Sequence, residues 1–577
     1  MFSKILIANR GEIAIRIMRT AQEMGIATVG VYSDADSNAL HVRMAGEAYR
    51  IGPAAPSHSY LHIPALLKVA AQSGAQAVHP GYGFLAENAE FARAVVAAGL
   101  TWIGPHADAI DAMGDKLRAR QAMRKANVPF VPGGTEAILD VAAAREAAAL
   151  YGLPLALKAS GGGGGKGLKV AHTLDDVASA FSTATREAQA YFKNGTIYAE
   201  RYLDNPKHVE LQILADKHGN VVHIGDRDCS LQRRHQKLWE EAPAQISQSV
   251  REAMCEAGLR AARAIKYDSV GTIECLVQGD EFFFLEMNTR IQVEHTVSEM
   301  ISGIDLIREQ IRVAAGEPLG YTQADITFRG VSIEGRVNAE DTTDNFRPAP
   351  GTLRAYHEPA GLGVRVDSAA FAGMTIAPEY DSMIAKLIVW APTRDQAIAR
   401  MRRATSEYVI EGVPTTLGLL NALCDHAPVT DARYGTATLE HFAQNFRATT
   451  TIPEPVAIAP APTSDAVRVE VNGKLFHVRV LDPIKGTRTA NTPQRPNVIR
   501  KTSRSMSGNE ISSPMHGVIV ELHAVEGSNV KAGDVVAVIE AMKMMNEVRA
   551  HKDGTITTIH TSVGATVEAS APIITLS

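Results

Sequence analysis

The chain has 577 residues, of which 45% are hydrophobic and 21% charged, and its formal net charge is −5 at neutral pH. This length exceeds a single hydrophobic core, so several globular domains are expected, and the negative charge gives no reason to expect nucleic acid or a membrane surface as partner. The absence of a secretory signal and of any run of about 20 apolar residues predicts a cytoplasmic enzyme, and its four scattered cysteines favour neither a disulfide framework nor a zinc site.

The first elements predict an alternation of strand and helix. Residues 4–8 form a buried-strand run, residues 13–24 carry apolar side chains at helical spacing, and Gly25 precedes a second strand at residues 26–32. A strand–helix–strand unit of this kind predicts a parallel sheet with right-handed crossovers. The intervening turn, residues 9–12, reads Asn-Arg-Gly-Glu rather than GxGxxG, so no dinucleotide site is predicted there.

Residues 161–165 are five consecutive glycines, followed by Lys166. A glycine run removes every β-carbon, so successive backbone N–H groups can approach phosphate oxygens. It is not the GxxxxGK[ST] loop, because no Ser or Thr follows Lys166, and alone it fits a flexible lid or linker equally well. Lys158 at the end of the preceding strand and Lys116 on a helix would add cations for the phosphates of a nucleotide, which favours a phosphate site.

The region from residue 271 to 295 predicts a hairpin. If its turn centres on Asp280, Glu274 and Glu286 stand opposite each other, and two facing carboxylates repel unless a cation lies between them. Continued strand alternation would then place a set of polar residues on one face: Glu286, Asn288, Arg290, Gln292 and Glu294. An exposed polar face is the simpler explanation, but the order of metal-binding oxygens, guanidinium and carboxylate favours a site.

Beyond Phe446 the composition changes. Residues 448–465 are rich in Pro and Ala, which indicates an extended linker, and residues 467–480 predict a hairpin around an Asn-Gly turn. Residues 485–509 carry Lys and Arg without acidic residues, and a flexible chain of about 25 residues spans roughly 25 to 30 Å, so the last domain should be mobile. A solvated linker and a segment that docks on an acidic partner both fit this basic run.

The C-terminal domain contains an internal repeat, in which Gly517 matches Gly554 and Gly527 matches Gly564, each 37 residues apart. Both copies alternate apolar and polar residues between turn signals, which predicts a flattened sandwich of two short antiparallel sheets. Lys543 falls on the turn between the copies and is flanked by methionines. An ordinary solvated lysine and a lipoyl attachment site are the alternatives, but exposed methionines are unusual at either.

The segment Ala-Met-Lys-Met at residues 541–544, with Pro-Met-His-Gly at residues 514–517, resembles the attachment site of biotinyl carrier domains. Residues 1 to about 447 resemble biotin carboxylases, members of the ATP-grasp ligases, in several long motifs that occur in the same order. These motifs are residues 7–12, 79–83, the glycine run, 227–237 and 286–295. The whole chain is similar to the α subunits of bacterial biotin-dependent acyl-CoA carboxylases.

The resemblance implies an α/β ATP-grasp carboxylase with an N-terminal Rossmann-like parallel sheet, followed by an all-β biotinyl domain. The expected order is an N-terminal domain at 1–115, an ATP-grasp domain at 116–330 with a mobile glycine-rich lid at about 131–204, and a carboxylase C-terminal domain at 331–447. Two linkers and the hairpin would occupy 448–510 and the carrier domain 511–577.

The resemblance also implies the site residues. Those for ATP are Lys116, Lys158, Gly163, Gly164, Gly165, Glu200, Tyr202, Leu203, His208, Gln232, His235 and Leu276. Glu274, Glu286 and Asn288 would hold Mg²⁺ or Mn²⁺. Glu294 would be the general base on bicarbonate, which is positioned by Lys237, Arg290, Gln292 and Val293 for conversion to carboxyphosphate. Arg336 would stabilise the biotin enolate, Tyr82 would line the same pocket, and Lys543 would carry biotin covalently.

The implied partners are a carboxyltransferase β subunit, a biotin protein ligase and a second copy of the carboxylase part. The chain departs from related α subunits in one place, because the usual docking domain is reduced to residues 448–510. The acceptor would be acetyl-, propionyl- or methylcrotonyl-CoA. The alternatives are an ATP-grasp carboxylate–amine ligase with a lipoyl-like carrier, the biotin carboxylase subunit of a pyruvate carboxylase, and a carrier protein whose large domain has lost activity.

Overall fold

A computed structural model describes residues 1–160, 167–192, 194–234, 236–446, 466–471, 474–479, 509–515, 517–541, 544–568 and 570–577. The chain forms two compact units, a large N-terminal unit and a smaller C-terminal one, and each is described by itself. Within the ranges above, no helix has both the length and the apolar character needed to cross a bilayer.

The N-terminal sheet is parallel, with strand order β3-β2-β1-β4-β5. Its elements are β1 (Lys4–Ile7), α1 (Gly11–Glu23), β2 (Ala27–Ser33), α2 (Leu40–Met44), β3 (Glu47–Gly52), α3 (Ile63–Ser73), β4 (Ala77–His79), α4 (Ala89–Ala97), β5 (Thr101–Trp102) and α5 (Ala107–Gly114). Helix α1 ends before Gly25, whose φ of 72° few other residues adopt without strain. The alternation of strand and helix expected for residues 4–32 is therefore confirmed.

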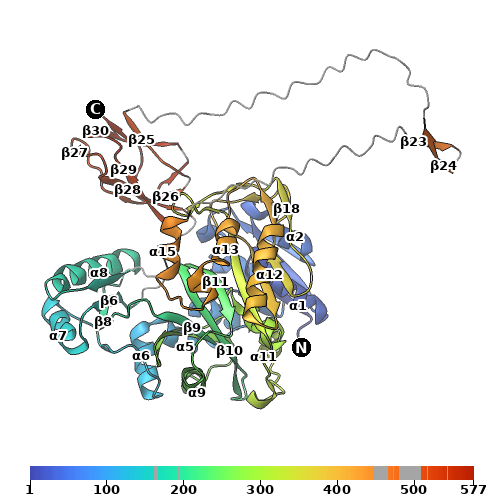
Figure 1. Ribbon diagram of the computed structural model, residues 1–577, viewed down its shortest axis with the longest axis horizontal. Helices are drawn as coiled ribbons and strands as arrows, with labels where there is room; N and C mark the ends of the chain where they lie inside the picture. Colours follow the sequence, from blue (N-terminus) through green and yellow to red (C-terminus); the bar gives the residue numbers. More distant parts are fainter. Residues whose placement is uncertain are drawn as a thin grey trace, which may run out of the picture. The chain divides into compact units, whose positions relative to one another are not determined.

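A small sheet with the order β7-β6-β8 follows α6 (Lys116–Lys125). It contains β6 (Leu155–Ala159), β7 (Leu168–Ala171) and β8 (Ile197–Arg201), and α7 (Val141–Tyr151) and α8 (Asp176–Phe192) pack on it (Figure 1). The buried side chains between helices and sheet are mostly alanines, which let the layers approach closely. This part coincides with the segment expected to form a lid.

The largest sheet is antiparallel, with strand order β13-β12-β9-β10-β11-β14-β21-β19. Its strands are β9 (Lys207–Ala215), β10 (Val221–Arg233), β11 (Gln236–Ala242), β12 (Val270–Gln278), β13 (Glu281–Asn288), β14 (Val331–Asn338), β19 (Val364–Ser368) and β21 (Met383–Ala391). Residues on both sides of position 330 belong to this one sheet, so it joins the expected ATP-grasp and C-terminal segments.

Helices accompany this sheet in chain order: α9 (Gln248–Ala264), α10 (His295–Ser302), α11 (Leu306–Ala314), α12 (Arg394–Glu407), α13 (Leu417–Leu423), α14 (Ala427–Thr430) and α15 (Thr438–Asn445). Short strand pairs complete this part: β15 (Glu340–Asp341) with β16 (Arg347–Pro348), β17 (Gly351–Thr352) with β20 (Thr375–Ile376), and β18 (Ala355–His357) with β22 (Val409–Glu411). The helices bury both faces of the large sheet, so polar side chains on its strands must find partners inside the protein.

The hairpin β12–β13 places Glu274 opposite Glu286, as expected. However, Gln278 pairs with Glu281, so the turn centres between Gly279 and Asp280 rather than on Asp280. A β-bulge between Glu274 and Cys275 restores the pairing, because one strand carries an extra residue there. The prediction that Glu274 faces Glu286 is thus confirmed, although the predicted centre of the turn was half a residue away from the observed one.

The prediction that strand alternation continues to residue 294 was wrong. Strand β13 ends at Asn288, and α10 begins at His295. The carboxylate of Glu87 accepts hydrogen bonds from Thr289 N (3.1 Å) and Arg290 Nε (2.8 Å). These bonds supply partners outside the sheet, so the chain leaves the ladder here, and we call residues 289–294 the β13–α10 loop.

The C-terminal domain contains the two expected antiparallel sheets, β25-β32-β30-β27 and β29-β28-β26-β31. Their strands are β25 (Glu510–Ser512), β26 (Gly517–Leu522), β27 (Asn529–Val530), β28 (Val535–Ala541), β29 (Met544–Arg549), β30 (Gly554–Ile559), β31 (Thr566–Val567) and β32 (Pro572–Leu576). Gly527 N donates to Ile556 O (2.8 Å), and Gly564 N donates to Ile519 O (2.7 Å). In each bond the donor and the acceptor belong to different repeats, and the two bonds are related by the 37-residue offset. Each repeat therefore supplies hydrogen-bond partners to the other.

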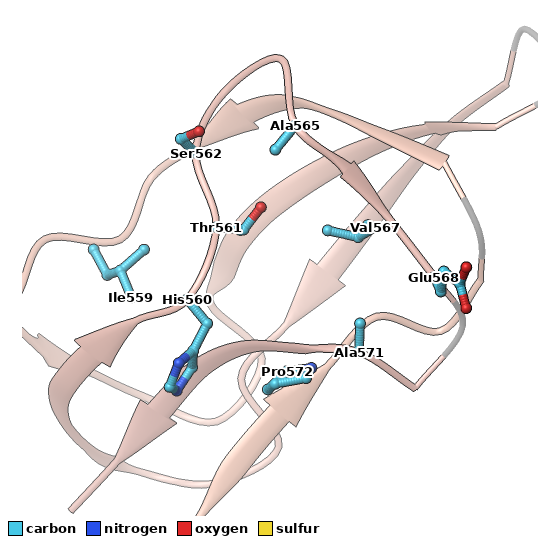
Figure 2. A pocket seen from close by; sticks show the side chains of 9 residues that line it. All are labelled: Ile559, His560, Thr561, Ser562, Ala565, Val567, Glu568, Ala571 and Pro572. Atoms are coloured by element: carbon cyan, nitrogen blue, oxygen red, sulfur yellow. The ribbon is translucent and has the colours of Figure 1, made fainter. Parts of the chain in front are cut away.

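Strands β23 (Ala466–Val471) and β24 (Lys474–Arg479) pair antiparallel, with Val467 opposite Val478. The Asn-Gly turn between them and both linkers lie outside the described residues. In the carrier domain, an open cavity of about 700 Å³ lies between the loops on either side of β31, where His560, Thr561 and Glu568 line it (Figure 2).

Candidate functional site

Polar residues of β9 form the floor of the site. His208, Glu210 and Gln212 alternate along the strand with apolar residues that enter the core. All three polar side chains are buried, and Glu210 and Gln212 are inaccessible to solvent. Sequence reasoning named His208 but missed Glu210. The signal was present, because a strand that alternates polar and apolar residues inside a covered sheet presents a buried polar face.

Lys237, at the start of β11, lies among three carboxylates. Its Nζ is 3.1 Å from Glu274 Oε1 and 2.8 Å from Glu294 Oε1, and it also contacts Glu210. Burial alone would lower the pKa of Lys237, but the carboxylates raise it well above the usual value. The ammonium therefore stays charged and holds residues from three different elements together.

Arg227 on β10 is fully buried and binds side chains of the same cluster. Its Nη2 donates to Glu210 Oε2 (3.0 Å) and Thr272 Oγ1 (3.1 Å), and it also contacts Gln292 Oε1. This contact fixes the orientation of the Gln292 amide, whose Nε2 donates to Glu274 Oε1 (2.8 Å). Arg227 was part of a sequence motif but was not assigned a role.

Glu294 precedes α10 and faces two cations. Arg336 on β14 donates from Nη2 to Glu294 Oε2 (2.8 Å) and from Nε to Glu240 Oε1 (2.6 Å). Burial would raise the pKa of Glu294, but Lys237 and Arg336 outweigh burial and the neighbouring Glu210 and hold this pKa at about 2. Burial raises the pKa of Glu240 to about 7 despite Arg336.

The expected metal ligands lie at one end of the hairpin β12–β13. Glu274 faces Glu286, and Asn288 Nδ2 donates to Glu274 Oε1 (2.7 Å). Lys116 Nζ donates to Glu286 Oε2 (2.7 Å), and it outweighs the effect of burial so that the pKa of Glu286 is about 2. Two facing carboxylates and an amide side chain form a donor set that suits Mg²⁺ or Mn²⁺, so the residues present fit the ion.

His208, Glu210 and Glu274 also place one potential ligand atom each within 4.8 Å of one another. Burial would lower the pKa of His208, but Glu274, whose Oε2 lies 3.0 Å from Nε2, and Glu210 raise it to about 9. An imidazolium donates hydrogen bonds and does not ligate a metal. This trio is therefore a less suitable cation site than the pair Glu274 and Glu286.

The residues expected to bind ATP approach this hairpin from the small sheet and from α6. Lys158 on β6 contacts Glu200 on β8, whose Oε2 also accepts from Arg120 Nη1 (2.6 Å). Lys116 N donates to Ser160 O (3.2 Å), so the residue before the glycine run is attached to the start of α6.

Four apolar side chains lie at the edge of the expected ATP site: Leu203, Leu276, Val131 and Phe283 pack together. Tyr202 N donates to Pro154 O (2.9 Å), and Gln232 Nε2 lies 3.3 Å from His208 Nδ1. The predicted residues Gly163, Gly164, Gly165, His235 and Lys543 lie outside the described residues.

Tyr82, expected near biotin, makes its hydroxyl contact with Glu12 of α1 rather than with the group around Lys237. Arg290 extends from the β13–α10 loop to Asn288, whose Oδ1 accepts from Arg290 Nη2 (3.0 Å). Within the described ranges, the site thus contains three kinds of group. Lys116 and Lys158 are cations that can bind phosphates, Glu274 and Glu286 are paired carboxylates that can hold a divalent metal, and Glu294 is a carboxylate between two further cations. Together with a small sheet that precedes a larger antiparallel sheet, this arrangement defines an ATP-grasp ligase.

Comparison with known proteins narrows the class. Residues 1–110 match the N-terminal domain of biotin carboxylase, 115–322 the ATP-binding domain of carbamoyl-phosphate synthase L chain, 334–441 the C-terminal domain of biotin carboxylase, and 509–576 the domain of biotin-requiring enzymes. Biotin carboxylase 1 of Bacillus subtilis is 50% identical over 445 residues, which cover 77% of this chain and 99% of that protein. The chain belongs to the biotin carboxylase family and joins an ATP-dependent biotin carboxylase to a carrier domain.

Other relatives differ in their names. A pyruvate carboxylase subunit from Methanothermobacter thermautotrophicus is 51% identical, over 73% of this chain and 86% of that one. The biotin-dependent acyl-coenzyme A carboxylase alpha3 subunit of Mycobacterium leprae is 42% identical, over 98% of this chain and 97% of that one. The biotin carboxylase domain dimer of Hydrogenobacter thermophilus 2-oxoglutarate carboxylase, solved with MgADP, ADP and bicarbonate, has a TM-score of 0.75 and 46% identity, covering 78% of this chain and 99% of that domain.

Proposed function

We propose that this chain is the α subunit of an acyl-CoA carboxylase, which carboxylates biotin on Lys543 and passes the carboxyl group to a carboxyltransferase on another polypeptide. The supporting observation is the correspondence with the Mycobacterium leprae subunit, which extends over 98% of this chain and includes the carrier domain. The relatives named for biotin carboxylase and pyruvate carboxylase correspond to 77% and 73% of it.

A second candidate is a subunit of pyruvate carboxylase. The Methanothermobacter thermautotrophicus subunit has the higher identity, 51% against 42%, over the carboxylase region. This region activates bicarbonate and does not touch the acceptor, so its similarity favours neither acceptor. Pyruvate and 2-oxoglutarate therefore belong in the acceptor assay beside the acyl-CoA esters.

In the proposed reaction, Glu294 removes the proton of bicarbonate while a bicarbonate oxygen attacks the γ-phosphate of ATP. With its pKa held at about 2, the carboxylate is ionised but weakly basic. Lys237 and Arg336 both contact it, so their transfer to the bicarbonate anion would remove the stabilisation and raise its basicity. The same cations would thus bind the substrate and activate the base.

On the phosphate side, Lys116, Lys158, His208 and the glycine run that includes Gly163, Gly164 and Gly165 would hold ATP. The adenine base would lie against Leu276 and Leu203, with Glu200, Tyr202, Gln232 and His235 around the nucleotide. Glu274, Glu286 and Asn288 would hold Mg²⁺ or Mn²⁺, which neutralises phosphate charge when bound. In the β13–α10 loop, Arg290, Gln292 and Val293 would position the bicarbonate anion opposite the phosphates.

On the biotin side, Arg336 would stabilise the negative charge that develops when biotin captures CO₂ from carboxyphosphate. A guanidinium remains charged at every relevant pH, and the Glu240 carboxylate holds Arg336 in place. Tyr82 would line the pocket from the N-terminal domain. Biotin protein ligase is the proposed donor of biotin to Lys543, and a second carboxylase unit is a proposed partner.

The test is reconstitution. The purified biotinylated chain should cleave ATP only with bicarbonate, and steady cleavage beyond one turnover per carrier should require free biotin. Its natural partner, recovered by affinity purification, should add acceptor activity. Assays with acetyl-, propionyl- and methylcrotonyl-CoA, pyruvate and 2-oxoglutarate then identify the acceptor. Activity with an acyl-CoA alone supports the proposal. Activity with pyruvate alone assigns the chain to the second candidate.

A further inference from the structure

Lys386 is a fully buried cation that lies directly beside the site, and none of the roles described above belongs to it. It lies on β21, opposite Arg336 of β14 in the sheet register and opposite Asp367 of β19 on its other side. Residues directly opposite each other in an antiparallel sheet project from the same face. Lys386 and Arg336 therefore approach the β13–α10 loop side by side.

The two cations bind consecutive residues of that loop. Arg336 Nη2 donates to the Glu294 carboxylate (2.8 Å), and Lys386 Nζ donates to the backbone carbonyl of Val293 (3.0 Å). The carbonyl before it, Gln292 O, lies 2.7 Å from His295 Nδ1. Burial and the nearby cation Lys386 lower the pKa of His295 well below its usual value, so the neutral ring donates this bond.

Lys386 is itself held by acidic residues from two other elements. Its Nζ is 3.3 Å from Glu12 Oε2 of α1 and 3.7 Å from Asp367 Oδ2 of β19. The Tyr82 hydroxyl contacts the other oxygen of Glu12. A single ammonium thus connects the peptide group between Val293 and Glu294 to the side chain that holds Tyr82.

We propose that Lys386 is a positioning residue of the carboxylase reaction, which fixes the Val293–Glu294 peptide for bicarbonate binding and couples it through Glu12 to Tyr82. It does not touch the reacting atoms. A buried, unpaired backbone carbonyl would be costly, and a charge-assisted bond to it is stronger than a neutral one. The inference rests on the proposed role of Glu294 and its loop in binding bicarbonate.

The decisive variant is Lys386→Met, which keeps the length of the side chain and removes the donor. Arg16→Met is the matched control, because Arg16 is a similarly buried cation whose Nη2 lies 2.8 Å from both Glu299 Oε1 and Asp305 Oδ1, without contact to residues 289–294. Both variants lose buried ion pairs, so a general loss of stability affects both. Thermal unfolding of the full-length biotinylated protein measures that loss.

In bicarbonate-dependent ATP cleavage, Lys386→Met should raise the KM for bicarbonate about 10- to 100-fold, as expected for one lost charge-assisted hydrogen bond, and leave the KM for ATP within about twofold. Without substrates, hydrogen exchange of the amides at 289–294 should become faster. Arg16→Met should show neither change. An unchanged bicarbonate KM in Lys386→Met, or an equal rise in Arg16→Met, would refute the positioning role. Wild-type ATP cleavage that does not depend on bicarbonate would instead refute the proposed function.

Discussion

At the scale of single residues, the site is defined by several carboxylates that lie close to one another around a shared cation. Glu210, Glu274 and Glu294 all contact Lys237, and such a group is stable only because Arg227, His208 and Arg336 balance the remaining charge. Truncating a member to alanine leaves a buried ion without its partner and also a cavity, whereas an amide keeps the side-chain volume and a hydrogen-bonding group. Conservative amide substitutions therefore test chemistry with less loss of stability than alanine substitutions.

We expect Glu294→Gln to lower bicarbonate-dependent ATP cleavage by about 10²- to 10⁴-fold, the usual effect of losing a general base. Binding of ATP should stay nearly unchanged, because Glu294 contacts Lys237 and Arg336 rather than the residues proposed for the phosphates. Steady-state ADP release and equilibrium nucleotide binding measure the two effects. The control is Glu281→Gln at the exposed hairpin turn. A loss of less than about tenfold would make Glu294 a structural residue.

Several charged partners of the site could not be predicted from their positions in the sequence. Lys237, Glu294 and Arg336 belong to motifs that a family resemblance identifies. Glu240 and Glu87 are recognised only when the fold places them beside Arg336 and Arg290, from distant parts of the chain. The first pair depends on the register of β11 and β14 and the second on how two loops meet in the tertiary fold, and a single sequence leaves both open.

His41 makes the stability of the N-terminal domain depend on pH. Burial lowers the pKa of this fully buried histidine to about 4, against about 6.5 for a free histidine. The unfolded chain therefore binds the extra proton first, so stability is complete above pH 6.5 and falls as the pH drops towards 4, by at most roughly 3 kcal/mol. Denaturant unfolding should show a shallower fall for His41→Gln than for the wild type. Parallel curves for the two proteins would contradict a buried neutral His41.

At the scale of elements, hydrophobic alternation predicted the type of each strand better than its end. The repeat in the carrier domain was predicted because turn glycines recur at fixed spacing, and Gly527 and Gly564 indeed share a positive φ. The bulge after Glu274 was not predicted, because no turn residue marks it. The end of β13 was also missed, because the Glu87 carboxylate that draws the chain away comes from the N-terminal domain.

The turn between the repeats leads to a prediction about modification. Lys543 alone should carry biotin, because it alone combines the flanking methionines with the junction of β28 and β29. Intact-mass measurement after coexpression with biotin protein ligase should show one biotin on the wild type and on Lys531→Ala, and none on Lys543→Ala. The last variant should still carboxylate free biotin. Biotin found on Lys543→Ala would disprove this assignment.

The hairpin β23–β24 leads to a prediction about assembly. It is the only paired-strand element described between residues 447 and 508, and its outer edges offer backbone groups to an added strand. Deleting residues 467–480 should weaken association with the carboxyltransferase, measured by co-purification and sedimentation. Deleting the equally long segment 451–464 of the Pro- and Ala-rich linker is the control. Unchanged assembly after the first deletion would place docking on the carboxylase or carrier domain.

At the scale of the whole molecule, the eight-stranded sheet with edge strands β13 and β19 combines two segments that the sequence suggested were separate domains. This continuity brings Arg336 and Lys386 to the β13–α10 loop, although both come from the segment after residue 330. The order of domains could be predicted from motifs. The close contact of C-terminal cations with a central loop could not, because it depends on the packing of strands separated by many residues.

The last prediction concerns the division of labour between this chain and its partner. The sites proposed for ATP, metal, bicarbonate and biotin all lie on this chain, whereas the acceptor site is proposed to lie on the partner. The isolated biotinylated chain should therefore turn over once per carrier and then stop. Rapid quench with labelled bicarbonate should show a burst of at most one carboxyl group per Lys543, and steady transfer should begin only when a carboxyltransferase is added. Lys543→Ala is the control and should show no burst. Sustained carboxylation of any acyl-CoA by the isolated chain would mean that the acceptor site lies on this polypeptide.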